Sequence, residues 1–376
     1  MDELYKDVFN KLFASQGGYF NLTDLEDAVE LKVMYEEFLD RCTKLVDKHL
    51  LRYVDPPKFH LAFLRSTELS AIVGKSGEDY YIGLNFGSIL VMSNLFGRVL
   101  CSPNILPYIG EISLEENQKI KNPYIFGLEA LLDNSHNYPD QRSYPIGIER
   151  QDWASTLVFY CIQFITLHEL GHIMRGHLSY KLSKNEIPIQ ILAPGLLQGL
   201  VSQGMELDAD YYATFHGTRE VISLLKSETM KHKGRQIVKV EAEEMLKLWI
   251  FAIHSMNSLY DLVPIQATTL ENKSHPPFGM RTFSILRIIM NALDGRGEFG
   301  GDEQISAYAH EFVMHCAATS MHAFDEICDD DGIKFLQSKN AMTSASLCYA
   351  HSKNVWSAYN IIWPEIRKHK LLFVDS

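Results

Sequence analysis

The spacing of hydrophobic and polar positions predicts that the chain begins with helices. Residues 1–55 read as helical, and from Leu25 to Leu51 apolar side chains recur at helical spacing with charged residues between them. The pair Pro56-Pro57 breaks this pattern, because proline removes a backbone donor and fixes φ. The first helical region is therefore expected to end near residue 55.

A small β element is predicted directly after the prolines. Three short apolar or alternating segments are typical of strands, and they cover residues 59–64, 69–73 and 80–86. The polar, glycine-containing segment 74–79 predicts a hairpin between the last two.

The rest of the chain reads as helix with irregular connections. Residues 101–150 are rich in Pro, Asn, Gly and Tyr, which favours loops with short helices, and 294–301 is the clearest linker. The expected helices cover residues 88–100, 151–182 as one long helix, 196–227, 235–263, 280–293 and most of 303–376. The pattern therefore predicts a mainly α chain with a small β-sheet, an α+β fold. Three regions are expected, 1–55, 56–293 and 303–376, with one compact domain as the alternative.

No membrane-spanning segment is expected. The longest apolar run, Trp153 to Leu167, is about 15 residues and falls short of the roughly 20 needed to cross a bilayer. It leads directly into His168 and Glu169, which are costly in lipid. Both this run and the apolar stretch 246–263, which polar residues interrupt, are typical of buried core helices.

Composition and charge favour a cytoplasmic globular protein. The chain is 46% hydrophobic and carries 35 basic against 47 acidic residues, a net charge of −12. An acidic chain is a poor partner for nucleic acid or anionic membranes. The six cysteines form no CxxC pair and are expected to be reduced, buried thiols. The N-terminus has no basic segment followed by an apolar one, so no signal peptide is expected.

One motif carries clear chemistry: the sequence HELGH at residues 168–172, which has the form HExxH. Residues four apart lie on the same face of a helix, so His168 and His172 can hold one metal ion together. Glu169 lies beside them and can take a proton from a water molecule that zinc activates. The two histidines and Glu169 are therefore a candidate zinc site with a general base.

The third metal ligand must come from elsewhere in the chain. The HExxHxxGxxH class is rejected, because its third histidine position is Leu178. His177 is five residues past His172, which points it away from the ligand face of a continuous helix. It is therefore expected as a capping or surface histidine, with a metal ligand as the minor alternative.

The segment ELDAD at 206–210 supplies a better third ligand. Glu206 and Asp210 share one helix face, so Glu206 can ligate the metal while Asp210 accepts the free ring N–H of a ligating histidine. Asp208 is the alternative ligand, and a solvated acidic face is the alternative without function.

A further candidate block is SHPPFGMR at 274–281. His275 precedes two prolines, which hold it in a stiff extended segment from which it can stabilise the oxyanion of a tetrahedral intermediate. Arg281 can pair with Asp210 or with a substrate carbonyl. An incidental histidine in a loop before a helix is the alternative.

These three blocks resemble the gluzincin metallopeptidases, whose zinc ligands are two histidines of HExxH and a later glutamate. HELGH with ELDADYYA resembles the Lit-type phage-exclusion peptidases, and SHPPFGMR resembles the HtpX-type membrane proteases. The ImmA/IrrE-type repressor-cleaving peptidases share the HELGH motif. The resemblance covers about 120 residues and implies a zincin-like core at 56–293, with added helices on both sides.

The resemblance implies a soluble zinc-dependent endopeptidase with one Zn²⁺ per chain, held by His168, His172 and Glu206. Its partners would be an intracellular protein or peptide substrate and an activating partner. A Lit-like phage-defence role, a quality-control role and repressor cleavage stay open. So do a non-proteolytic zinc-binding regulator and a helical protein in which HExxH is accidental. The short strands at 58–85 are expected to form an edge on which an extended peptide lies, and substitutions along 80–86 would test this role. Region 303–376 is expected to gate the site.

Overall fold

The computed structural model describes most of the chain and shows a mainly helical fold with a small mixed sheet. The described residues are 3–26, 28–116, 144–185, 195–226, 231–232, 235–236, 242–260, 274–293, 303–327 and 331–372. The helices are α1 (Glu3–Leu12), α2 (Val29–Leu50), α3 (Phe86–Cys101), α5 (Ile148–Met174), α6 (His177–Asn185), α7 (Gly195–Lys226), α8 (Ala242–Tyr260), α9 (Phe278–Leu293), α10 (Glu303–Ile327) and α11 (Asp331–Ile366). Short 3₁₀ helices cover Ala14–Gln16, Leu22–Leu25, Ile112–Leu114 and Arg367–His369. The predicted fold class is confirmed.

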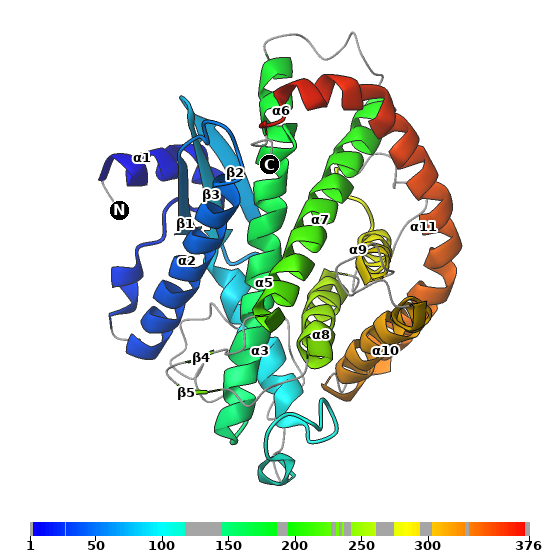
Figure 1. Ribbon diagram of the computed structural model, residues 1–376. Helices are drawn as coiled ribbons and strands as arrows, with labels where there is room; N and C mark the ends of the chain where they lie inside the picture. Colours follow the sequence, from blue (N-terminus) through cyan, green and yellow to red (C-terminus); the bar gives the residue numbers. More distant parts are fainter. Residues whose placement is uncertain are drawn as a thin grey trace.

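Helices α5 and α7 run side by side through the middle of the molecule, and the other elements pack around them (Figure 1). The sheet with α1 and α2 lies on one side, and α11 curves around the other. The largest hydrophobic cluster contains Tyr35 of α2, Leu167 of α5, Ile285 of α9 and Val313 of α10. Residues from all three predicted regions therefore share one core, while the division into regions stays a prediction.

The sheet contains β1 (Phe59–Leu64), β2 (Ala71–Ser76) and β3 (Asp79–Asn85) in the order β1-β3-β2. The predicted hairpin is confirmed, because β2 pairs antiparallel with β3 across a turn at Gly77-Glu78. β1 pairs parallel with β3. β3 is the central strand, so its backbone groups are paired on both sides and it offers no edge, while the expected edge role of the strands at 58–85 stays a prediction. Within the described sheet, β1 and β2 are the outer strands. A second, two-stranded sheet joins β4 (Lys231–His232) and β5 (Arg235–Gln236).

The predicted long helix at 151–182 is wrong in one respect, because the chain breaks between α5 and α6. Gly176 adopts φ = +84° at the break, a conformation that side chains other than glycine rarely take. A Cβ at this position would also lie 2.7 Å from the backbone of His369 and Lys370. The break at Gly176 interrupts the helical spacing between α5 and α6, so His177 does not take the position that a continuous helix would give it.

Helix α5 is, among the described residues, the single helix long and apolar enough to cross a membrane by length and composition alone. However, 94% of its most apolar window is buried within the fold. This burial is typical of a core helix. The five cysteines among the described residues are free and buried, as expected, and Cys328 lies outside the described residues.

Two buried charged residues fix the start of α5. Arg150 is fully buried, and its guanidinium donates to the carbonyls of Leu100, Ser102, Ile105, Leu106 and Ile109 at 2.7–3.3 Å. Glu115, also fully buried, accepts from the backbone N–H of Ile146 and Gly147 at the helix N-terminus. Each charge is thus met by several backbone groups, which offsets its desolvation.

We expect Arg150→Met to destabilise the fold by about 3 kcal/mol or more, because it leaves several buried carbonyls without a donor. Urea unfolding followed by circular dichroism measures the change. Arg287→Met, at an exposed position on α9, is the matched control and should change stability by less than about 0.5 kcal/mol. Equal stability of the two variants would contradict the role assigned to Arg150.

Candidate metal centre

The two helices at the centre of the fold approach closely where the HExxH motif lies. A Cβ added at Gly171 would stand 3.1 Å from the Cβ of Tyr212 and 3.3 Å from the Cα of Ala209 on α7. A larger residue at this position would push the helices apart. The small residues at 171 and 209 therefore allow side chains of α5 and α7 to meet.

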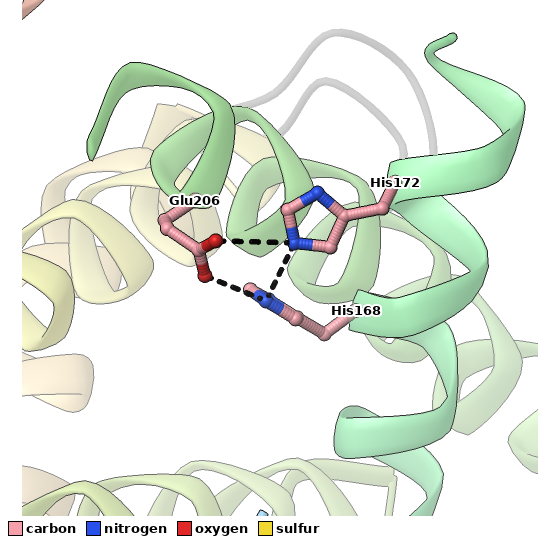
Figure 2. A group of neighbouring side chains, drawn as sticks. All are labelled: His168, His172 and Glu206. Carbon is pink, nitrogen blue, oxygen red and sulfur yellow. Dashed lines mark hydrogen bonds and ion pairs between the residues drawn. The ribbon is translucent and has the colours of Figure 1, made fainter. Parts of the chain in front are cut away.

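His168 and His172 of α5 and Glu206 of α7 point toward one another in this contact (Figure 2). The Nε2 atoms of the two histidines are 3.2 Å apart, and each lies 3.2–3.5 Å from an oxygen of Glu206. Four ligands at about 2.0–2.2 Å around a tetrahedral metal stand roughly 3.3–3.6 Å from one another. The three ligand atoms therefore have the separation that one metal ion requires, and the group could hold such an ion.

The three side chains are buried, with 6–7% of each residue exposed. Burial would raise the pKa of Glu206, but the neighbouring His172 and His168 rings lower this pKa well below the usual carboxyl range. Glu206 is therefore a carboxylate, the form that ligates a metal. Among the described residues, no other group of three His, Cys, Asp or Glu side chains converges in this way.

Asp210 supports His168 from the side opposite the metal group. The Oδ1 of Asp210 lies 2.8 Å from Nδ1 of His168, and Arg281 of α9 donates to both Asp210 oxygens at 2.6 and 2.8 Å. Burial would raise the pKa of Asp210, but Arg281 and His168 outweigh it and lower this pKa to about 2. The charged carboxylate keeps the proton of His168 on Nδ1, which leaves Nε2 free for a metal.

His177 supports His172 by a hydrogen bond, as Asp210 supports His168. The prediction that His177 takes a capping or surface position is wrong. It is fully buried, and its Nδ1 lies 3.1 Å from Nδ1 of His172. Its Nε2 lies 3.1 Å from Oδ2 of Asp208 and 3.0 Å from the hydroxyl of Tyr359 on α11. Burial is the main cause that lowers the pKa of His177 to about 4, so the ring is neutral. It can then donate from Nε2 to Asp208 and accept at Nδ1 from His172.

Asp208, the alternative ligand, fixes the position of His177 and thereby supports His172. It accepts two hydrogen bonds from Arg175 at 2.6 and 2.8 Å and one from Tyr359 at 2.8 Å. Burial would raise the pKa of Asp208, but His177 and Arg175 lower it well below the usual carboxyl range. The side chain is buried, which contradicts a solvated acidic face.

Two predicted site residues remain, Glu169 and His275. Glu169 directly follows His168 on α5 and is 9% exposed. His275 precedes α9, and its Nε2 lies 3.8 Å from Oε2 of Glu206, while 62% of its side chain is exposed. A partly exposed imidazole therefore stands beside the buried metal group.

Comparison with protein families, curated proteins and solved structures finds no match for this chain.

We expect the purified protein to contain about one metal ion per chain, and Glu206→Ala and His172→Ala to lose it. Elemental analysis after gel filtration measures this content. Glu149→Ala, at an exposed position on α5, is the matched control and should keep the metal. A Glu206→Ala protein that retains its metal would contradict the ligand set.

Metal binding should release a proton near neutral pH. Burial alone would lower the pKa of His168, but hydrogen bonds to Asp210 and Glu206 outweigh burial and raise this pKa to about 10 in the metal-free protein. The stability that this proton contributes is fully present below the unfolded pKa of about 6.5 and is lost as the pH rises toward 10. A metal must displace the proton, so metal affinity should increase with pH across this range.

Calorimetric titration of zinc into metal-free protein at pH 7.5 measures this release, in two buffers with different heats of ionisation. We expect the observed heats to differ by the amount that about one proton per chain requires. Identical heats in both buffers would show that His168 is neutral before the metal binds.

Proposed function

We propose that the protein is a zinc-dependent metallopeptidase of the gluzincin kind that hydrolyses peptide bonds in an intracellular protein. The observation that carries this proposal is the convergence of His168, His172 and Glu206 at tetrahedral ligand spacing in a buried site. Two imidazoles and one carboxylate form a ligand set typical of catalytic zinc, which keeps its fourth position open. Zinc bound there would act as a Lewis acid that polarises a carbonyl group and lowers the pKa of water.

The side chains around the group have separate parts in such a reaction. Glu169 takes a proton from the attacking water and returns it to the leaving amine, which makes it the general base and then the general acid. His275 can donate a hydrogen bond to the oxygen of the scissile carbonyl as negative charge develops there. Asp210 with Arg281, and His177 with Asp208, hold the two ligating imidazoles in fixed tautomers and orientations.

A peptide substrate would be held by strand addition at the outer strand β2. This strand contacts both α5 and α6, and its partner β3 lies on the other side, so β2 is the outer strand on this side of the described sheet. An extended peptide paired with β2 would lie near α6 and near α5, the helix that carries HExxH. The buried ligand set and a neighbouring strand edge together favour peptide hydrolysis over a purely structural metal site.

Residue Glu169 distinguishes a peptidase from a protein that only binds metal. We expect Glu169→Gln to keep its metal and to lose hydrolysis of a quenched-fluorescent peptide library by about 10²- to 10⁴-fold, because the amide cannot accept the proton. Glu149→Gln on the same helix is the matched control and should keep full activity.

His275→Ala in the same assay should keep its metal and lose a smaller part of the rate, because only one donor to the carbonyl oxygen is removed. A native protein that binds zinc but cleaves no peptide of the library, alone or in the presence of cell extract, would favour a zinc-binding regulator. Equal activity of Glu169→Gln and native protein would contradict the role of Glu169.

A further inference from the structure

A cavity of about 720 Å³ lies apart from the metal group, beside the opposite face of α7. Glu206 and Asp210 share the metal face of this helix, whereas Tyr212, Phe215 and Arg219 follow Asp208 at helical spacing on the other face. The cavity is bounded by the end of α2, the end of α5, α7 and the segment after α11. Its lining residues are Leu51, Arg52, Tyr53, Met174, Arg175, Tyr211, Tyr212, Phe215, His216, Arg219 and Lys370.

The wall of this cavity is strongly basic in an otherwise acidic protein. Arg52, Arg175, Arg219 and Lys370 reach it from four separate parts of the chain, and no acidic residue is among its lining residues in the described structure. The whole chain carries a net charge of −12. The fold therefore gathers four cationic side chains at one cavity, a clustering that the composition does not predict.

Two of these cations, Arg175 and Arg52, lie beside carboxylates outside the lining of the cavity. Asp208 binds Arg175, and Glu220 lies 3.8 Å from Arg52 while it also accepts a hydrogen bond from Lys48. The positive charges of the arginines also act on the buried ring of His216. Burial, followed by the charges of Arg52, Arg219 and Arg175, lowers the pKa of His216 to about 3. The imidazole is thus held neutral beside the cations.

Aromatic rings form the other part of the wall. The rings of Tyr211 and Phe215 lie nearly parallel, with 5° between their planes, and the guanidinium of Arg219 lies 5.4 Å from the centre of the Phe215 ring. Tyr211 is 45% exposed, so its ring is accessible. Tyr53 and Tyr212 complete the aromatic surface. Flat apolar rings beside guanidinium groups suit a ligand that joins an aromatic ring to phosphate groups.

We propose that this cavity is a nucleotide-binding site, with the phosphates on Arg52, Arg219 and Lys370 and the base against Tyr211 and Phe215. Its volume lies within the range of about 300–1,000 Å³ that is usual for small-ligand sites. Arginine binds phosphate oxygens in a planar, two-point geometry and also stacks on bases. An inorganic anion would not use the aromatic wall, and an uncharged aromatic compound would not use the cations.

Isothermal titration calorimetry tests both halves of the proposed ligand without added divalent metal. The probes are ATP, adenosine and tripolyphosphate. We expect ATP to bind with a Kd below about 100 μM, and adenosine and tripolyphosphate each to bind at least about tenfold more weakly. The ATP affinity should fall as the salt concentration rises. No binding of ATP at about 1 mM would overturn the proposal, and so would tripolyphosphate that binds as tightly as ATP.

Variants locate the binding in this cavity. Arg219→Glu should weaken ATP binding at least about tenfold, whereas Arg287→Glu, an exposed arginine on α9, should leave it unchanged. Tyr211→Ala should weaken ATP but not tripolyphosphate, because it removes only the aromatic surface. Thermal unfolding confirms that each variant is folded.

Glu206→Ala separates this site from the metal centre. The Glu206→Ala protein should bind ATP with the native affinity. The nucleotide-binding proposal is therefore independent of the peptidase proposal. Loss of ATP binding in Glu206→Ala would instead place the ATP at the metal group and overturn the proposal, as would native affinity in Arg219→Glu.

Discussion

The close approach of α5 and α7 is the constraint on which the candidate metal centre depends. Neither helix holds a complete set of ligands: α5 supplies two imidazoles, and α7 supplies the carboxylate. Gly171 lets the helices meet, because a side chain there would lie against Tyr212 and Ala209. Helices held farther apart would separate His168 from both Asp210 and Glu206, and buried polar groups that lose their partners cost free energy. Both the close packing of the helices and the meeting of the metal ligands therefore require a residue without a side chain at position 171.

Each ligating histidine is supported by a hydrogen-bonded chain that ends at an arginine. His168 is followed by Asp210 and Arg281, and His172 is followed by His177, Asp208 and Arg175. Both carboxylates are almost fully buried, and each is compensated by a two-point contact with its guanidinium. The chains draw on α6, α9 and α11, which explains how elements far from the HExxH motif in sequence hold its geometry. Tyr359 gives the C-terminal helix a direct contact with one of these chains.

The sequence predicted the parts of this site that depend on one helix alone. The four-residue spacing of His168 and His172, and of Glu206 and Asp210, sets each pair on one face whatever the tertiary structure. His177 and Asp208 could not be placed in this way. Their roles depend on the chain break at Gly176, which turns His177 back toward His172, and the glycine at 176 alone did not reveal the direction of that turn. The sequence likewise could not show which of the predicted strands are the outer ones, because strand order depends on long-range pairing that a local pattern does not encode.

Helix α7 is the element that relates the metal group to the basic cavity. One of its faces carries Glu206 and Asp210, and the other carries Asp208 and the aromatic wall. Arg175 belongs to the surroundings of both the cavity and the metal group. It lines the cavity and binds Asp208. Asp208 contacts His177, and His177 supports His172. A ligand that draws Arg175 toward the cavity would loosen its contact with Asp208, because one guanidinium cannot satisfy two anions equally. The two sites therefore share a hydrogen-bonded connection and differ in what they bind: the carboxylate-containing face suits a cation, and the arginine-lined face suits an anion.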